Sequence, residues 1–241
     1  MKIGVGILCF GDEFYFNGTV NKLTNLLNHN VDCYVITDKP HYFSGLNVNV
    51  IPYKREIQSY SDKLLLPKYV LEKNDVCIIV DADADIKDFS IFEKLKTYNF
   101  KPGITYIDTL LSHPTKKKLI GDINMKENEW REYQTYCKSI LPTFNTHETI
   151  WEYFLVINKI DFNYKKFYYE YEKLQLIKEY CDLPYGKNVV GAGEGISILI
   201  SSILSNTPIQ RDEELYEMLK NNVISISKRH TKPQFWPSWM I

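Results

Sequence analysis

Cys77-Ile78-Ile79-Val80-Asp81-Ala82-Asp83-Ala84-Asp85 is the stretch of this sequence that decides its fold. Its first half is a run of apolar, mostly β-branched residues, which is typical of a strand buried on both faces of a parallel sheet. The run stops at three alternating aspartates, Asp81, Asp83 and Asp85. Because ligands of open α/β sheets bind beyond the carboxyl ends of the strands, the stretch predicts a buried strand that delivers carboxylates into a crevice.

The spacing of these aspartates predicts a site for a divalent cation. In an extended segment, residues two apart point to the same side, so Asp81 and Asp83, with Asp85 as a further candidate, would converge on one ion. Carboxylate oxygens are hard ligands that suit magnesium or manganese, and such ions usually bridge to substrate phosphates. The sequence therefore favours a metal-dependent enzyme that acts on a nucleotide sugar. The alternative is a solvated acidic loop after a core strand.

Strands and helices alternate on both sides of this stretch. Alternation of this kind implies an α/β fold with a mostly parallel, doubly wound central sheet and helices on both faces. Strands are predicted at 2–10, 31–38, 48–51, 77–80, 103–107, 149–158 and 223–227. Helices are predicted at 19–29, 61–72, 91–98, 127–139, 163–181 and 213–220, with a further helix that begins near 193 and ends near 204.

Composition and charge narrow the function. The formal net charge is −1, which gives no bulk attraction to nucleic acid, so any phosphate recognition must be local. The five cysteines show neither metal-type spacing nor a disulfide framework and are interpreted as buried thiols in a reducing compartment. No stretch approaches the roughly 20 apolar residues of a membrane span, and the apolar N-terminal run is too short for a signal peptide. We therefore expect a soluble, cytoplasmic protein.

Two further acids lie where functional residues are expected. Glu194 stands between two glycines at the start of a predicted helix, where the helix dipole favours an ionised carboxylate. In a retaining enzyme it would attack or stabilise an oxocarbenium-like centre, and in an inverting one it would act as the base; the alternative is a purely structural carboxylate. Asp38, at the end of the second strand, is a candidate for contact with a nucleoside or for capping a turn.

The chain resembles the GT-A glycosyltransferases, and within them the retaining family eight, which includes glycogenin and the bacterial galactosyltransferases of lipooligosaccharide synthesis. The first 90 residues match this family better than the remainder does. Four stretches carry the likeness: Ile-Leu-Cys-Phe-Gly-Asp-Glu-Phe-Tyr at 7–15, Ser-Asp-Lys-Leu at 61–64, the Asp-x-Asp motif Ile-Val-Asp-Ala-Asp at 79–83, and His-Thr-Lys-Pro at 230–233 followed by Trp236.

The resemblance implies a nucleotide-sugar site with a bound cation. Manganese or magnesium would be held by Asp81, Asp83 and His230. Tyr15 would stack on uracil, which favours a UDP-linked donor. The family's Asp-Gln pair is missing, and Glu194, as the nearest acidic substitute, would be the catalytic carboxylate. The residues that would contact the donor are Cys9, Gly11, Asp12, Tyr15, Asp38, Lys63 and Lys232.

On this resemblance the chain would be one catalytic domain at 1–241, with a nucleotide-sugar and metal-binding half at 1–107 and an acceptor-side half at 108–241. It would transfer a sugar, with retention, to a hydroxyl of a glycan, glycolipid or protein, with no nucleic-acid partner and no transmembrane segment. The alternatives are a sugar-phosphate nucleotidyltransferase and a non-catalytic nucleotide-binding relative. The last is motivated by two departures from the family: the absence of its Phe-Asn-Ala-Gly strand start, with Thr-His-Glu-Thr-Ile-Trp at 146–151 in that place, and a missing Asp-Gln pair.

Overall fold

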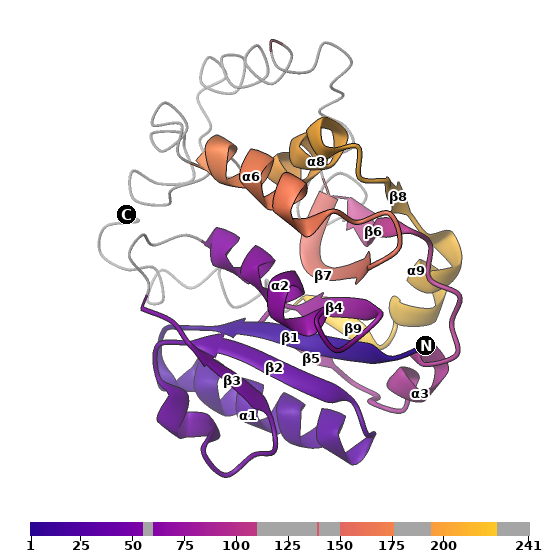
Figure 1. Ribbon diagram of the computed structural model, residues 1–241. Coiled ribbons are helices and arrows are strands. Elements are labelled where there is room, and N and C mark those ends of the chain that lie inside the picture. The colour runs from indigo at the N-terminus through magenta and orange to yellow at the C-terminus, as the bar shows by residue number, and fades with distance from the viewer. Residues whose placement is uncertain (55–59, 110–138, 140–149, 176–193, 226–241) are drawn as a thin grey trace, which may run out of the picture.

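The computed structural model of the protein describes residues 1–54, 60–109, 139, 150–175 and 194–225. Within these residues the core is a seven-stranded sheet with the strand order β3-β2-β1-β4-β7-β6-β8 (Figure 1). The predicted α/β class with a mostly parallel central sheet is confirmed. The strands are β1 (Ile3–Cys9), β2 (Asp32–Thr37), β3 (Asn49–Pro52), β4 (Val76–Val80), β6 (Gly103–Thr109), β7 (Ile150–Asn158) and β8 (Ile209–Arg211).

The pairing directions bring the ends of the first four strands together. β1 pairs in parallel with β2 and β4, β2 with β3, and β6 with β8. β7 pairs antiparallel with both β4 and β6, so in the described sheet it alone runs against the others. The carboxyl ends of β1 to β4 therefore lie at one edge. We call this edge, with the residues that directly follow those strands (Phe10, Asp38, Tyr53 and Asp81), the carboxyl edge.

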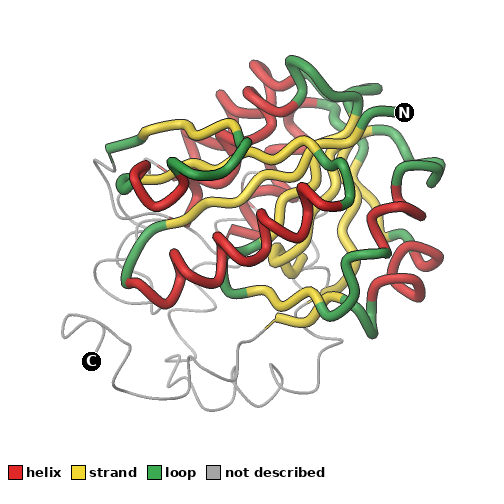
Figure 2. Tube along the Cα trace, turned by 90° about the horizontal axis from the view of Figure 1, so that it is seen from below, coloured by secondary structure: helices red, strands yellow, loops and turns green. Residues whose placement is uncertain are grey.

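Helices cover both faces of the sheet. One buried cluster packs α1, α3 and α9 against one face, and another packs α2, α6 and α8 against the opposite face. Figure 2 shows helices in front of and behind the strands, as the doubly wound prediction requires. The helices are α1 (Glu13–Asn28), α2 (Leu66–Val70), α3 (Ile91–Leu95), α6 (Tyr164–Gln175), α8 (Glu194–Ser205) and α9 (Glu213–Leu219), with short 3-10 helices η1 (Pro40–Phe43) and η2 (Tyr60–Leu65).

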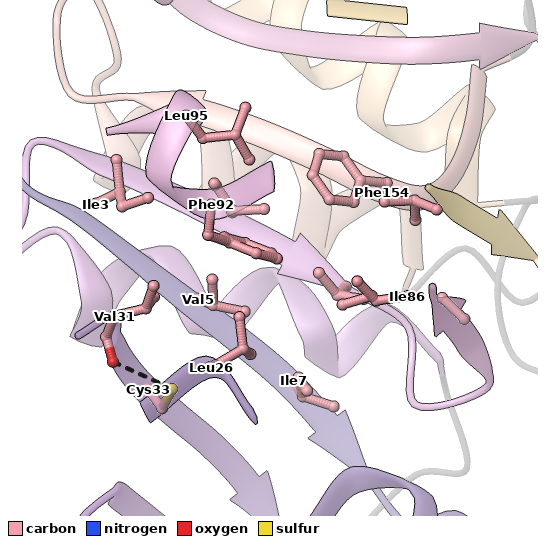
Figure 3. Close-up of a cluster of buried hydrophobic side chains, with 14 of the residues drawn as sticks. Ile3, Val5, Ile7, Leu26, Val31, Cys33, Ile86, Phe92, Leu95 and Phe154 are labelled. Carbon is pink, nitrogen blue, oxygen red and sulfur yellow. Dashed lines mark hydrogen bonds between the residues drawn. The ribbon is translucent and has the colours of Figure 1, made fainter. Parts of the chain in front are cut away.

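The sequence of β1 explains how the two faces differ. Its side chains alternate, and Ile3, Val5 and Ile7 point into the cluster beneath α1 (Figure 3). Gly4 and Gly6 face α2 instead. A Cβ on Gly4 would lie 2.7 Å from Val70 Cγ1, and a Cβ on Gly6 would lie 2.8 Å from a methyl of Leu66. The two glycines therefore allow α2 to pack directly on the sheet.

Two helices differ from the prediction. α1 begins at Glu13 rather than at residue 19, because the segment expected to be a turn is capped by Asp12 and forms the first turn of the helix. The helix predicted at 61–72 is divided into η2 and α2. Pro67 lies in the first turn of α2, and because proline has no N–H it favours the start of a helix over its interior. The helix predicted at 127–139 lies outside the described residues except for its last position.

The structure contains a second, two-stranded sheet that was not predicted from the sequence. In the described chain a second sheet joins β5 (Ala84–Ile86) to β9 (Val223–Ser225), with Ala84 opposite Ser225 and Ile86 opposite Val223. This pairing places a late segment of the chain directly beside the acidic stretch. No helix in the described ranges is both long and apolar enough to cross a membrane.

Candidate functional site

The acidic stretch after β4 is a turn and not an extended segment. The backbone N–H of Ala84 donates to the carbonyl oxygen of Asp81 over 3.0 Å, and Ala84 then begins β5. We call residues 81–84 the acidic turn. The expectation that Asp81, Asp83 and Asp85 line up through extended geometry is therefore wrong. Asp81 and Asp83 occupy the first and third positions of the turn, whereas Asp85 is an exposed residue of β5.

A buried lysine lies beside the acidic turn. Lys63, at the carboxyl edge in η2, places its Nζ 2.9 Å from Oδ1 of Asp81. The Lys63 side chain is 5% exposed and that of Asp81 is 29% exposed. The structure thus brings together two residues that the sequence analysis assigned to one site from separate motifs. A charge this well buried requires a charged or polar partner, and the Asp81 carboxylate supplies one.

A second lysine contacts the turn from the opposite face of the sheet. Its place in the site was not predicted from the sequence. Lys22 is a buried residue of α1, and its Nζ donates to the carbonyl oxygens of Ala82 and Ala84 at 2.5 and 2.8 Å. Burial lowers the pKa of Lys22, while the nearby carboxylates, Asp83 first, act to raise it. The available signal was a lysine within the apolar stripe of an amphipathic helix, three residues after Thr19 and four before Leu26, which are both buried.

The start of α1 also lies at the carboxyl edge. Asp12 is the N-cap of α1, and its carboxylate accepts a hydrogen bond from the backbone N–H of Phe14 over 3.0 Å. Gly11 has a φ of 107°, which favours glycine, and its carbonyl accepts from Lys39 Nζ over 3.0 Å. Tyr15 is half-buried, with its ring centroid 5.5 Å from that of Phe14. These residues and the exposed Asp38 thus follow neighbouring strands, as a nucleotide site would require.

Cys9 does not fit a side-chain role in ligand binding. Its side chain is fully buried in the cluster beneath α1, and burial raises the pKa of the thiol to about 11. A ligand at the carboxyl edge would have to contact its backbone. The prediction of buried thiols is confirmed for the described cysteines, since Cys9, Cys33 and Cys77 are all free and buried.

The other predicted site residues are described in part or not at all. Glu194 is the first residue of α8, so the predicted helix start is confirmed, but its side chain is outside the described portion. His230 and Lys232 lie outside the described residues. The described chain stops at Ser225, which is opposite Ala84 of the acidic turn.

The acidic turn has the chemistry of a partial metal site. Within the described portion of the chain, no group of three or more His, Cys, Asp or Glu side chains could hold an ion. Asp81 and Asp83 are nevertheless partly exposed oxygen donors in one turn. Magnesium commonly takes one or two protein carboxylates and completes its shell with substrate phosphates and water. The residues present therefore fit a divalent cation that binds together with a phosphate ligand.

A cavity of about 320 Å³ is lined by residues of α1, of the acidic turn and of β5. Asp83 and Asp85 line it from one side, Lys22 from another, and the rings of Phe14 and Phe89 complete its apolar wall. Carboxylates next to aromatic rings are suited to a polar ligand with an apolar face.

No protein-family model matches the sequence, and no curated protein matches it. Among solved structures, the chain is similar to the galactosyltransferase LgtC in complex with donor and acceptor sugar analogues, at 12% identity and a TM-score of 0.49, over 96% of this chain and 81% of that one. It is also similar to a mutant of Drosophila β-1,4-galactosyltransferase 7 in complex with manganese, UDP-Gal and xylobiose, at 10% identity and a TM-score of 0.49, over 99% and 76% of the two chains. A third similar structure is mouse xyloside xylosyltransferase 1, at 9% identity and a TM-score of 0.45, over 88% and 85%. Because these TM-scores are all below 0.5, the function has to be derived from the residues of this chain.

Proposed function

We propose that this chain is a GT-A-type glycosyltransferase that transfers a sugar, with retention, from a nucleotide sugar to a hydroxyl of a glycan, glycolipid or protein. A UDP-linked donor is favoured, with manganese or magnesium as the cation. The observation that carries the proposal is the ion pair between buried Lys63 and Asp81 in an acidic turn at the carboxyl edge. A charged cluster of this kind, at the edge where α/β sheets bind ligands, suits a phosphate-bearing substrate with a cation.

Six described residues at or near the carboxyl edge have distinct tasks in this proposal. Asp81 and Asp83 hold the cation, and Lys63 orients Asp81. The cation, when bound, neutralises the negative charge that develops on the leaving diphosphate. Tyr15 offers its ring to the base of the donor, while Asp12 and Asp38 provide acceptors for nucleoside hydroxyl or imino groups.

The late part of the chain contributes the remaining groups of the proposal. Ser225 lies opposite Ala84, and the five residues from there to His230 span at most about 18 Å. This reach supports His230 as a further metal ligand and Lys232 as a partner of the diphosphate. Glu194, at the start of α8, is proposed as the carboxylate that attacks or stabilises the anomeric centre. In this division, residues 1–107 form the nucleotide-sugar and metal-binding half, and residues 108–241 form the acceptor-side half, whose C-terminal tail adds His230 and Lys232 to the donor site.

A thermal-shift panel tests the proposal. UDP-, GDP-, ADP- and dTDP-sugars are added with and without manganese to the wild type, to Asp83→Asn and to Asp85→Asn. A ligand present at 100 times its Kd stabilises the native state by about 2.7 kcal/mol, which raises the melting temperature by several degrees. We expect a manganese-dependent shift with UDP-sugars that is lost in Asp83→Asn and kept in Asp85→Asn, the matched acid on β5.

Two results would contradict the proposal. The first is a folded wild type whose melting temperature responds to none of the nucleotides, with or without manganese. The second is release of pyrophosphate from UTP and a sugar phosphate, which would identify a nucleotidyltransferase instead.

Once a donor has been identified by thermal shift, sugar transfer is measured as UDP release in the presence of candidate acceptor sugars.

A further inference from the structure

Lys22 is buried in the core, where unpaired lysines are rare. It belongs to the buried stripe of α1 together with Thr19, Leu23 and Leu26, and it is 8% exposed. A buried ammonium group loses its hydration, and that loss must be offset by hydrogen bonds and by nearby negative charge. Both are present: two backbone carbonyls accept from Nζ, and the carboxylates of Asp83 and Asp81 lie close enough to act on its pKa.

The two carbonyls are placed so that Lys22 controls the conformation of Asp83. The carbonyl of Ala82 belongs to the peptide unit before Asp83, and Lys22 holds it at 2.5 Å. The N–H of Ala84 belongs to the peptide unit after Asp83, and it donates to Asp81 within the turn. Lys22 also holds the carbonyl of Ala84, at the point where β5 begins. Both peptide planes that flank Asp83 are thus fixed, and with them the direction in which its Cα–Cβ bond points.

We propose that Lys22 is a positioning residue for the acidic turn, which sets the direction of the Asp83 carboxylate before donor and cation bind. The inference rests on the proposed function, because it assigns Asp83 to the cation. The carboxylates repel one another when no cation is bound, and the Lys22 ammonium offsets that repulsion while its hydrogen bonds keep the turn closed.

The direction in which manganese affinity changes in Lys22→Met distinguishes a positioning role of Lys22 from an effect of its charge alone. A positive charge near a cation site weakens cation binding. If Lys22 acted through its charge alone, its replacement by methionine would tighten manganese binding. If Lys22 acts by fixing the turn, the same replacement weakens manganese binding. Hydrogen bonds that orient metal-ligating residues typically contribute about tenfold or more to metal affinity.

The first experiment needs no ligand. Hydrogen exchange at the Ala84 amide, which closes the turn, is compared in the wild type and in Lys22→Met. We expect exchange to rise at least about tenfold, which corresponds to the loss of one hydrogen bond to a charged group. Lys96→Met is the matched control, since Lys96 also donates to a backbone carbonyl, that of His29 at the C-terminal end of α1. Exchange at Ala84 should be unchanged in this control.

The second experiment measures manganese affinity in the presence of UDP by electron paramagnetic resonance of the free ion. We expect binding to weaken about tenfold in Lys22→Met and to stay within about threefold of wild type in Lys22→Arg, which keeps both the charge and the donors. If Lys22→Met does not fold, Lys22→Gln replaces it, with the same directions expected.

Unchanged exchange at Ala84, or manganese binding that is unchanged or tighter in Lys22→Met, overturns the positioning role. A wild type that binds neither manganese nor UDP is a different failure, because it removes the proposed function. The exchange comparison still shows in that case whether Lys22 holds the turn.

Discussion

Lys63 Nζ and Asp81 Oδ1 are 2.9 Å apart, which is also the distance between Lys2 Nζ and Asp32 Oδ2. The two ion pairs differ in their surroundings. The side chains of Lys63 and Asp81 are 5% and 29% exposed, whereas those of Lys2 and Asp32 are 57% and 39% exposed. Because the two pairs have the same distance but different burial, the effect of burial on the coupling energy of an ion pair can be measured within one protein.

We expect a larger coupling energy for the buried pair. A double-mutant cycle with Lys63→Met and Asp81→Asn should give a coupling of about 1–3 kcal/mol in the free energy of unfolding, because water screens this pair only weakly. The cycle with Lys2→Met and Asp32→Asn should give a smaller value, since solvent surrounds both partners. Urea unfolding at low and high salt provides the measurement. Equal couplings in the two cycles would refute the expectation.

Gly6 should not tolerate a side chain. Because a Cβ would lie 2.8 Å from Leu66, Gly6→Ala forces α2 away from β1, and we expect the free energy of unfolding to fall by about 1–3 kcal/mol. Gly18→Ala is the control. Gly18 lies inside α1 with nothing within 4 Å of the added methyl, so alanine should stabilise the helix by about 0.5–1 kcal/mol. Opposite signs in chemical denaturation are expected, and a loss of stability in both variants would contradict the packing account.

The cap of α1 separates a structural role of Asp12 from a role in donor binding. Asp12→Ala removes the acceptor for the Phe14 N–H and should lower the free energy of unfolding by about 1 kcal/mol. Asp12→Asn keeps a side-chain oxygen and should leave stability nearly unchanged. If the Asp12 carboxylate also contacts the donor, both variants should weaken UDP-sugar binding in titration calorimetry. Weakened binding in Asp12→Ala alone would assign the residue to capping only.

Stability should fall at alkaline pH through the buried thiols. Burial, followed by the nearby Asp32 charge, raises the pKa of Cys33 to about 12 from 9.0. Below pH 9 both folded and unfolded chains keep this proton. As the pH rises from 9 towards 12, the unfolded chain loses the proton and the native chain retains it, so the free energy of unfolding falls by about 1.4 kcal/mol per pH unit from this thiol.

Cys33→Ala provides the check on this titration. Its unfolding free energy between pH 9 and 11 should have a slope shallower than that of the wild type by about the same amount per pH unit. Parallel slopes would show that the native thiol titrates near its ordinary pKa. Below pH 9 the variant should be less stable than the wild type, because the Cys33 Sγ packs in the core and donates to the carbonyl of Val31 (Figure 3).

The sequence was sufficient for β1, β2 and β4 because each is an apolar run whose pattern does not depend on distant partners, whereas β8, a three-residue strand at the edge of the same sheet, was not predicted. The same reasoning failed at the acidic turn. Asp-Ala-Asp-Ala alternates as a strand does, yet a hydrogen bond between Ala84 and Asp81 closes it into a turn. β5 and β9 were missed as a pair because three-residue strands have almost no period, and their pairing depends on a partner far along the chain.

Part of the candidate site was predictable for similar reasons. Asp81 and Lys63 could be assigned to one site because the stretches that contain them resemble two motifs of one family, and the structure places the two side chains in contact. Lys22 was missed because a lysine is expected at the surface, although its spacing from Leu23 and Leu26 places it in the stripe of α1. Only the tertiary position of the acidic turn beneath α1 turns it into a buried donor.

The pairing of β5 with β9 also determines when the acidic turn acquires its neighbours during synthesis. The ribosome synthesises β5 long before β9, so the pairing of Ala84 with Ser225 cannot form until the later strand has emerged. A nascent chain can form β1 to β4 by contacts that are local in sequence, but the strand that follows the turn has no β9 partner until the last described helix has emerged. The acidic turn at the carboxyl edge is therefore expected to reach its final structure late, after the sheet that supports it, and a translational pause before residue 223 would prolong the interval in which β5 is an open edge.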